Sequence, residues 1–283
     1  MAAELSCKDR IIVKESTLTN REKKIVAYLF SGRDDILNDT ITEFAEKAGV
    51  SDATVVRFCK HIGYKGYQDF KIHAALDILP RENQYNPVLR KDNEPGVILD
   101  KIFGSEIAVL KRTLGGVDQE TLIEVSRMIR HAEKILFIGT GGSMNVAKDA
   151  LHKFMKVGIM VYAYEDMDLQ RMAVSLLGEK DLVIAISHSG SNLNVLRCME
   201  LAKGGGVRTV ALTGDEKNPI ARAADLSIRV ACETTMFHSE SVSTRIAQLA
   251  VIDTLVAMVA FHDYDRSYDA IHATRKATAD NKF

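Results

Sequence analysis

The second half of the chain shows two alternating hydrophobic patterns. Five short, almost continuously apolar runs are typical of buried strands: residues 135–138, 159–164, 181–187, 207–212 and 226–230. The segments between them are helical or mixed, such as residues 145–156, where Val146 and Ala150 recur at helical spacing. Strands that are apolar along their whole length are covered on both faces. The pattern therefore predicts an α/β fold, in which helices sandwich a five-stranded parallel sheet.

The first half shows helical spacing, and capping residues mark three helix starts. Thr19 and Thr40 each precede a glutamate by three positions, which is a capping-box spacing, and Ser51 marks the third start. The middle helix stops at Gly49. Ala45, Gly49 and Val55 then have the spacing of two helices that cross closely at a short turn. This indicates a helix-turn-helix, whose second helix enters the major groove of DNA.

The second helix of that motif, from residue 51 to about residue 61, carries polar side chains on its outer face. Arg57 can bind guanine bidentately, and hydroxyl groups can bind phosphates or base edges. Residues 51–73 hold four basic and two acidic side chains. Another interpretation stays open, in which a small helical domain serves dimerisation and its charged face is only solvated. The residues predicted to bind DNA are Ser51, Asp52, Thr54, Arg57, Lys60, His61, Lys65 and Tyr67.

Three of the four prolines lie within residues 80–96, among charged and amide side chains. Such a stretch supplies few core residues and is typical of a linker. Helical spacing resumes in residues 97–114 and 119–131. We therefore predict a helix-turn-helix domain in residues 1–79, a linker in residues 80–96 and the α/β domain in residues 97–283.

The first predicted strand runs into a glycine-rich loop and then a helix. Glycines let the backbone approach a bound group, and the first N–H groups of a helix have no partner within the helix. Such a turn presents donors and the positive end of the helix dipole to an anion. Ser143 is expected to cap the helix or to donate to that anion. A plain turn that binds nothing is the competing interpretation. The loop reads Gly139-Thr140-Gly141-Gly142-Ser143.

A second loop of this kind, residues 187–192, follows the apolar residues 182–186 and precedes a helix at residues 193–203. Its hydroxyls, amide and helix-start N–H groups suit an anion. Because parallel sheets bind ligands at the carboxyl ends of their strands, two such loops predict a binding cleft. Thr213-Gly214 ends a further strand, but the charged residues that follow and Pro219 indicate a surface turn and a helix start.

The composition of the chain says more about its cellular compartment than about its function. With 46% hydrophobic and 27% charged residues the chain is typical of soluble globular proteins, and its net charge of -1 neither favours nor excludes nucleic acid. The four cysteines lie far apart, so neither a zinc site nor a disulfide framework is indicated. Residues 1–10 lack the apolar core of a signal peptide, and the most apolar helical stretch, residues 246–261, is shorter than the roughly 20 residues of a membrane span. We expect a cytoplasmic protein without a membrane anchor.

The two glycine- and serine-rich loops resemble the pair of phosphosugar-binding loops of the sugar isomerase (SIS) domain. Residues 48–60 and 63–67, with Phe70-Lys71, resemble the DNA-binding domain of RpiR-type bacterial transcription regulators. The late helix of that family is matched by Ser243-Thr244-Arg245-Ile246-Ala247-Gln248-Leu249. The resemblance extends from about residue 18 to about residue 260, and the two motifs in this order are more specific than either alone.

The resemblance implies a regulator of carbohydrate metabolism genes, in which a three-layer α-β-α SIS domain senses a phosphosugar and the helix-turn-helix binds operator DNA as a homodimer or homotetramer. It implies no cofactor, metal or catalytic residue. Two positions depart from the family: Asn192 stands where Thr is common, and Ser191 replaces a frequent Glu. Phosphate binding is expected to survive both changes. The implied ligand-binding residues are Thr140, Gly141, Gly142, Ser143, Ser187, His188, Ser189, Ser191, Asn192 and Glu240.

The alternative is an aldose-ketose phosphosugar isomerase, which needs a base beside the substrate. Glu240, His238 and His188 are its candidates, although a helix-start charge and ordinary hydrogen bonding explain them without catalysis. A dinucleotide-binding enzyme is disfavoured because Met144 occupies the third glycine position of that fingerprint. Residues 239–261 form a strongly apolar helix that suits a subunit interface as well as the core. The sequence does not fix whether the ligand strengthens or weakens operator binding.

Overall fold

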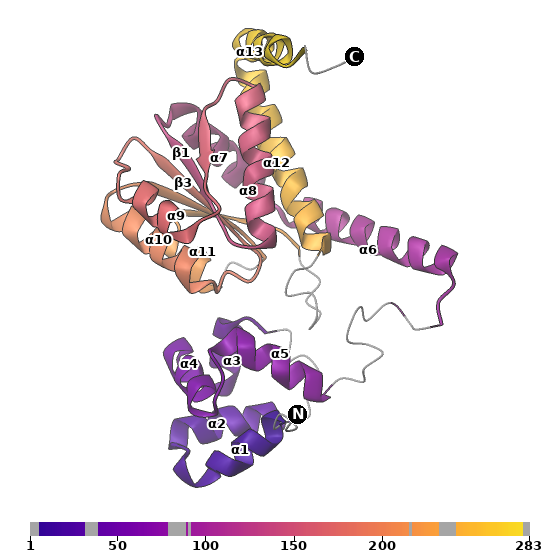
Figure 1. Cartoon of the computed structure of the whole chain (residues 1–283), viewed down its shortest axis with the longest axis vertical. Coiled ribbons are helices and arrows are strands. Elements are labelled where there is room, and N and C mark those ends of the chain that lie inside the picture. The colour runs from indigo at the N-terminus through magenta and orange to yellow at the C-terminus, as the bar shows by residue number, and fades with distance from the viewer. Residues whose placement is uncertain are drawn as a thin grey trace. The chain divides into compact units, whose positions relative to one another are not determined.

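The computed structural model describes residues 6–31, 39–78, 89, 92–214, 217–231 and 242–279 (Figure 1). The chain divides into two compact units, Met1–Gly104 with Glu233–Ser241 and Ser105–Cys232 with Val242–Phe283. The division falls inside helix α6 (Pro95–Gly116), which begins within the predicted linker of residues 80–96. Proline is well suited to a first helical position. Most of that linker lies outside the described residues, so the domain boundaries stay a prediction.

The N-terminal unit consists of short helices around an aromatic core. They are α1 (Cys7–Lys14), the 3-10 turn η1 (Glu15–Thr17), α2 (Asn20–Leu29), α3 (Ile41–Ala48), α4 (Asp52–His61) and α5 (Tyr67–Ile78). Phe44, Phe58 and Phe70 are at most 1% exposed. The ring of Phe70 contacts each of the other two edge-on, which is a favourable aromatic geometry.

Side-chain caps start the three helices at which they were predicted. Thr19 and Glu22 form a capping box at α2, and Thr40 and Glu43 form another at α3. The hydroxyl of Ser51 accepts a hydrogen bond from a backbone N–H in the first turn of α4. These caps satisfy N–H groups that a helix start otherwise leaves unpaired.

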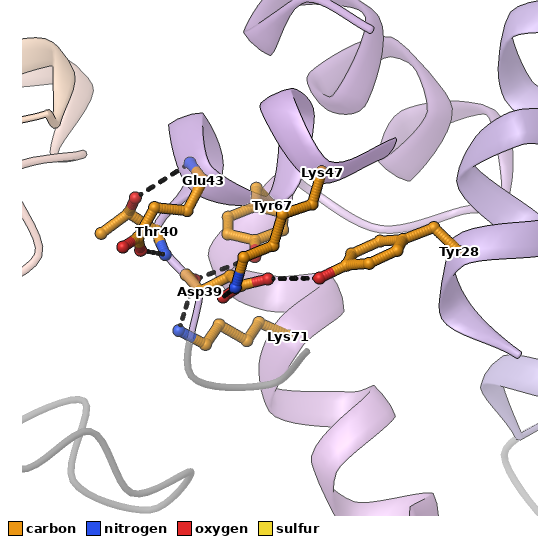
Figure 2. A network of polar contacts seen from close by, with 7 residues as sticks. All are labelled: Tyr28, Asp39, Thr40, Glu43, Lys47, Tyr67 and Lys71. Atoms are coloured by element: carbon orange, nitrogen blue, oxygen red, sulfur yellow. Dashed lines mark hydrogen bonds and ion pairs between the residues drawn. The ribbon is translucent and has the colours of Figure 1, made fainter. Parts of the chain in front are cut away.

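One buried carboxylate ties three helices of this unit together (Figure 2). The side chain of Asp39 accepts a 2.8 Å hydrogen bond from the hydroxyl of Tyr28 on α2 and pairs at 2.5 Å with the ammonium of Lys47 on α3. Its backbone carbonyl accepts from Tyr67 at 3.0 Å and from Lys71 at 2.9 Å, both on α5. Burial, with a further contribution from Asp39, raises the pKa of Tyr67, so this hydroxyl stays a donor. The chain just before α3 is thereby fixed to α2 and α5.

A second polar contact joins the end of α4 to the start of α2. The Nδ1 atom of His61 lies 2.9 Å from a carboxylate oxygen of Glu22, and its Nε2 atom lies 3.1 Å from the hydroxyl of Thr17. Glu22 also accepts from the backbone N–H of Thr19 at 2.7 Å. Burial alone would raise the pKa of Glu22, but the hydrogen bonds from Thr19 and His61 outweigh burial and lower it.

The second unit is a three-layer α/β/α sandwich, as predicted. Its five strands are all parallel, in the order β2-β1-β3-β4-β5. Helices α7, α8 and α12 cover one face of the sheet, and α9, α10 and α11 cover the other (Figure 1). Side chains alternate along a strand, so Phe137 belongs to the core on the first face and Ile138 to the core on the second. After α6 the elements are α7 (Gln119–His131), β1 (Ile135–Ile138), α8 (Gly142–Lys156), β2 (Val161–Ala163), α9 (Met167–Val174), β3 (Leu182–Ser187), α10 (Leu193–Gly204), β4 (Arg208–Thr213), α11 (Pro219–Ala223), β5 (Leu226–Arg229), α12 (Val242–His262) and α13 (Tyr264–Ala277).

Most predicted elements are present, with shifted ends. The strand β2 has three residues rather than the predicted 159–164, and α8 begins at Gly142, inside the glycine-rich loop.

The expectation that the apolar stretch of residues 246–261 is too short for a membrane span is wrong. Within the described residues, α12 is long and apolar enough to cross a membrane by length and composition. In this structure it packs against α7 and α8, with Ile252 and Leu255 in the core.

Replacing Asp39 by alanine is expected to destabilise the N-terminal unit by about 2–3 kcal/mol, because the buried hydroxyl of Tyr28 loses its acceptor. Thermal denaturation of the full-length protein, followed by circular dichroism, measures this loss. Tyr28→Phe should be less damaging, since it removes only the donor and the carboxylate of Asp39 keeps its ion pair with Lys47. If the two substitutions combined are as destabilising as the sum of the single ones, the hydrogen bond between them is not what stabilises the unit.

Glu22→Gln is expected to flatten the acid side of the stability profile. Because the folded pKa of Glu22 is lowered, its carboxylate stabilises the fold above the unfolded pKa, and this contribution is lost as the pH falls through the folded pKa. Denaturant titrations between about pH 5 and pH 3 should show a steeper loss for the wild type than for the variant. Glu15→Gln, at an exposed position, serves as the control. Equal slopes for wild type and Glu22→Gln would contradict this role.

Candidate functional site

Helices α3 and α4 form the predicted helix-turn-helix. After α3 the backbone of Gly49 is left-handed, with φ 66° and ψ 41°, a conformation that glycine adopts without a Cβ penalty. Ala45 and Val55 are 1% and 0% exposed and belong to one core cluster. They lie where the spacing placed the crossing of the two helices. The turn therefore fixes which face of α4 points outward.

Four of the predicted DNA-binding residues are exposed: Ser51, Arg57, Lys60 and Lys65. The side chains of Arg57 and Lys60 form no hydrogen bond or ion pair with any residue that the structure describes. Ser51 caps α4 with its hydroxyl. The outer face of α4 thus carries two cations that are not used within the unit.

The other four predicted DNA-binding residues form contacts within the unit. Thr54 and Tyr67 are buried, which corrects the prediction for these two, whereas Asp52 and His61 are half-buried and stay a prediction. Thr54 is 4% exposed and its hydroxyl is hydrogen-bonded to Ser51, while Tyr67 is 7% exposed and bonds to Asp39. Asp52 accepts a 2.9 Å hydrogen bond from a threonine hydroxyl on α3. His61 contacts the start of α2. Thr54 and Tyr67 belong to the core because their positions on α4 and α5 face it.

Parallel pairing of β1 with β3 brings the two predicted anion-binding loops together. Ile138 at the end of β1 pairs with Ala185 of β3, so both loops leave the same edge of the sheet. Across this edge, the side-chain Nδ2 of Asn192 donates a 3.1 Å hydrogen bond to the hydroxyl of Thr140. We call residues 139–143 and 187–192 together the cradle.

The first loop of the cradle presents unpaired donors at the start of α8. Gly141 is the N-cap residue, with φ 54°, and no side chain caps this helix. Of the two roles expected of Ser143, capping is therefore not observed. The N–H groups of Gly141 and Gly142 and the hydroxyl of Ser143 donate to no acceptor within the described part of the chain. These are the groups with which a helix start binds an anion.

A buried glutamine, not predicted from the sequence, holds this loop in place. Gln170 of α9 is 0% exposed. Its Nε2 donates to the carbonyl oxygens of Gly139 at 2.9 Å and of Tyr164 at 2.8 Å, and its Oε1 accepts from the N–H of Gly139 at 3.3 Å. The end of β1 is thereby tied to the end of β2. No local sequence signal distinguishes this glutamine from a solvated one.

The second loop satisfies part of its own polarity. The Oδ1 atom of Asn192 accepts from two backbone N–H groups of α10, each at 3.1 Å, and caps that helix. The hydroxyl of Ser191 donates to the carbonyl of Ser189 at 3.1 Å. Ser187, the last residue of β3, is 5% exposed, and His188 is half-buried. The hydroxyl of Ser187 has no hydrogen-bond partner among the described residues.

Buried Asn218 supports the second loop from the side of β4. The backbone of Gly190 has φ 59°, and a Cβ there would lie 1.8 Å from the side chain of Asn218. Asn218 is 0% exposed and donates to the hydroxyl of Thr213 at 2.8 Å. The helix start predicted at Pro219 is present. Of the charged residues predicted to form a surface turn before it, Lys217 is exposed, and Asp215 and Glu216 lie outside the described residues. Only glycine fits at position 190 because the amide of Asn218 fills the space.

An arginine from α12 completes the surroundings of the cradle. A Cβ on Gly142 would lie 3.4 Å from the side chain of Arg245, so this side chain lies against the start of α8. Arg245 forms no hydrogen bond or ion pair with the residues described here. Its sequence match to the late helix of the family was the available signal for its importance. Glu240 and His238 lie outside the described residues.

Comparisons with known proteins agree with this architecture. The chain matches the helix-turn-helix domain of the rpiR family over residues 6–79 and the SIS domain over residues 128–258. An HTH-type transcriptional regulator of Thermotoga maritima is 31% identical over 277 residues, which cover 97% of this chain and 98% of that relative. The HTH-type transcriptional regulator HexR of Escherichia coli is 30% identical over 267 residues, covering 94% and 92%.

A solved structure extends the similarity to the whole fold. The Vibrio vulnificus NanR protein complexed with ManNAc-6P has a TM-score of 0.81 and 24% sequence identity, covering 98% of this chain and 99% of that one. Its likeness concerns the fold, while the identity to the regulators above concerns the family. The chain therefore belongs to the rpiR family of helix-turn-helix transcription regulators that carry a SIS domain.

Proposed function

We propose that α4 binds operator DNA and that a phosphosugar bound in the cradle changes this binding. The observation that carries the ligand site is the hydrogen bond from Asn192 to Thr140, which joins two helix-start loops into one site. Ligands of parallel sheets bind at this edge. A regulator of this design needs only to bind its ligand, without converting it.

On the DNA side, three exposed cations support the proposal: Arg57, Lys60 and Lys65. Arg57 lies on the outward face of α4, where a guanidinium can bind a guanine edge. The two lysines suit the phosphates that flank such a contact. Ser51 at the start of α4 adds a hydroxyl near the helix end that enters the groove.

On the ligand side, the phosphate is assigned to the first loop of the cradle. The unpaired N–H groups of Gly141 and Gly142 and the hydroxyl of Ser143 supply neutral donors, and Arg245 supplies a cation. A phosphate monoester carries about two negative charges near neutral pH, which the positive end of α8 and the guanidinium both favour. Thr140 positions the loop through its bond from Asn192.

The sugar hydroxyls are assigned to the second loop, to Ser187, His188, Ser189, Ser191 and Asn192. Hydroxyl and amide groups can donate as well as accept, which suits a sugar. Because the similar NanR protein was solved with ManNAc-6P, phosphorylated amino sugars are the first class to test. The proposal for Glu240 rests on the family resemblance alone. Genes of carbohydrate metabolism are the expected targets.

We further place the protein in the cytoplasm as a homodimer or homotetramer. A dimer matches an operator with two related half-sites. Leu169 and Met172 on α9 are 48% and 61% exposed and lie on one helical face, which supports a subunit interface there. If the phosphosugar and the operator prefer different arrangements of the subunits, the ligand releases the DNA; a shared preference gives the opposite response.

Fluorescence anisotropy of the full-length protein on DNA from around its own gene tests the proposal. Sugar phosphates are added one at a time, and product formation is assayed in the same samples. Sequence-dependent binding that one phosphosugar alters without turnover is the expected result. Conversion of a phosphosugar without specific DNA binding would overturn it in favour of an isomerase.

Arg57→Gln is expected to weaken operator binding by about 1–3 kcal/mol and to relax sequence preference at one position, with phosphosugar binding unchanged. Arg21→Gln removes the same charge from an exposed position on α2 and serves as the control. Anisotropy titrations on operator and scrambled DNA compare the two. Equal losses on both DNA sequences would show that Arg57 contributes only non-specific charge.

Arg245→Gln and Ser187→Ala are each expected to lower phosphosugar affinity about tenfold, because a charge-assisted hydrogen bond and a hydroxyl contact are removed. Operator binding without ligand should stay unchanged. Isothermal titration calorimetry measures the affinities, with Arg197→Gln on the exposed face of α10 as the control. Unchanged affinity in Arg245→Gln would remove α12 from the ligand site.

A further inference from the structure

A polar cavity lies at the end of the sheet where the strands begin, opposite the cradle. It has a volume of about 190 Å³ and is formed where α7, α8 and α12 end and α13 begins. Because α7 leads into β1 and α8 leads into β2, the cavity lies where these strands begin. Its polar lining consists of Arg130, His131, His262, Asp263, Arg266 and Ser267.

Two arginines line this cavity without an ion pair to any described residue. The side chains of Arg130 and Arg266 form no hydrogen bond or ion pair with any residue in the described ranges, although Asp263 lines the same cavity. The Nε atom of Arg130 is buried and has no acceptor. Leaving a charged donor buried without an acceptor is costly. An acceptor from outside the chain would remove that cost.

Close packing of α13 against the turn between α8 and β2 forms one wall of the cavity. Gly158, in the turn between α8 and β2, has φ 83°, and a Cβ there would lie 2.9 Å from the Cβ of Ala270 on α13. Glycine thus lets α13 approach this turn closely. Figure 1 shows α13 crossing the ends of α8 and α12, and it contacts both helices. Ser267 is 5% exposed, and its N–H donates to the carbonyl of Asp263.

We propose that this cavity binds a small oxyanion of the phosphate class, either inorganic phosphate or the phosphate group of a monoester. A guanidinium binds such an anion through parallel N–H donors. No side chain caps α13, so its first N–H groups and the positive end of its dipole add to the attraction. The site is separate from the cradle, since none of its lining residues belongs to either loop.

Two features oppose an anion here. Asp263 is acidic, and the ends of α7, α8 and α12 present carbonyl groups that favour cations. Arg130 and His131 lie in the last turn of α7 and also suit its carbonyl end. The two guanidinium groups outnumber the one carboxylate, so the lining stays net positive before either histidine is protonated. A measurement of phosphate binding distinguishes an anion site from arginines that only neutralise the negative end of a helix dipole.

The test is isothermal titration calorimetry of the full-length protein with inorganic phosphate at low ionic strength. Arg266→Gln and Arg130→Gln are each expected to weaken one phosphate-binding event about tenfold or more. Arg275→Gln, exposed on the same helix α13, should leave it unchanged. Arg245→Gln should affect only binding in the cradle, so failure of this proposal and failure of the proposed function give different results.

The proposal is overturned if Arg266→Gln binds phosphate as Arg275→Gln does, or if Arg130→Gln lowers only the melting temperature. Arg266 is exposed, so its replacement decides the question even if Arg130→Gln fails to fold. A parallel titration with glycerol 3-phosphate separates the two sources. Tighter binding than inorganic phosphate, lost in Arg266→Gln, identifies a monoester; weaker binding identifies the free anion.

Discussion

The parallel pairing of β1 with β3 is the constraint on which the cradle depends. Two loops separated by about fifty residues of sequence meet only because these strands are neighbours and end at the same edge. The hydrogen bond from Asn192 to Thr140 links the two loops. Gln170 of α9 holds the first loop, and Asn218 at the start of α11 packs against the second. The N–H donors belong to the helix starts, but the order of the strands in the sheet determines where these helix starts lie.

Local signals account for what the sequence predicted well. The capping boxes at Thr19 and Thr40, the left-handed turn at Gly49 and the apolar run of β1 each depend on a few neighbouring residues, and all are present. The three-layer sandwich followed from the alternation of such signals. The sequence predicted less reliably which side of a helix faces the core. Thr54 and Tyr67 look like surface residues in sequence, but the core of the N-terminal unit covers them.

Residues of the site that come from distant parts of the chain were the hardest to predict. Asn218 and Gln170 are polar residues in polar-looking segments, and their burial depends on strand neighbours that a local pattern does not specify. Arg245 lies about a hundred residues after the loop that it contacts. In the N-terminal unit, His61 likewise contributes to the packing of helices, although the sequence pattern placed it among the DNA-binding residues.

The orientation of one amide has a consequence for selectivity. The Oδ1 atom of Asn192 is used by α10, so only its NH₂ group is turned toward Thr140 and the first loop. Together with the glycine N–H groups and the guanidinium of Arg245, it makes an environment of donors. A phosphate monoester that has lost both protons offers only acceptors there, whereas the monoanion brings a hydrogen of its own. Since the second ionisation of a phosphate monoester lies near pH 6, the proposed phosphate site would discriminate between protonation states of one metabolite within the physiological range.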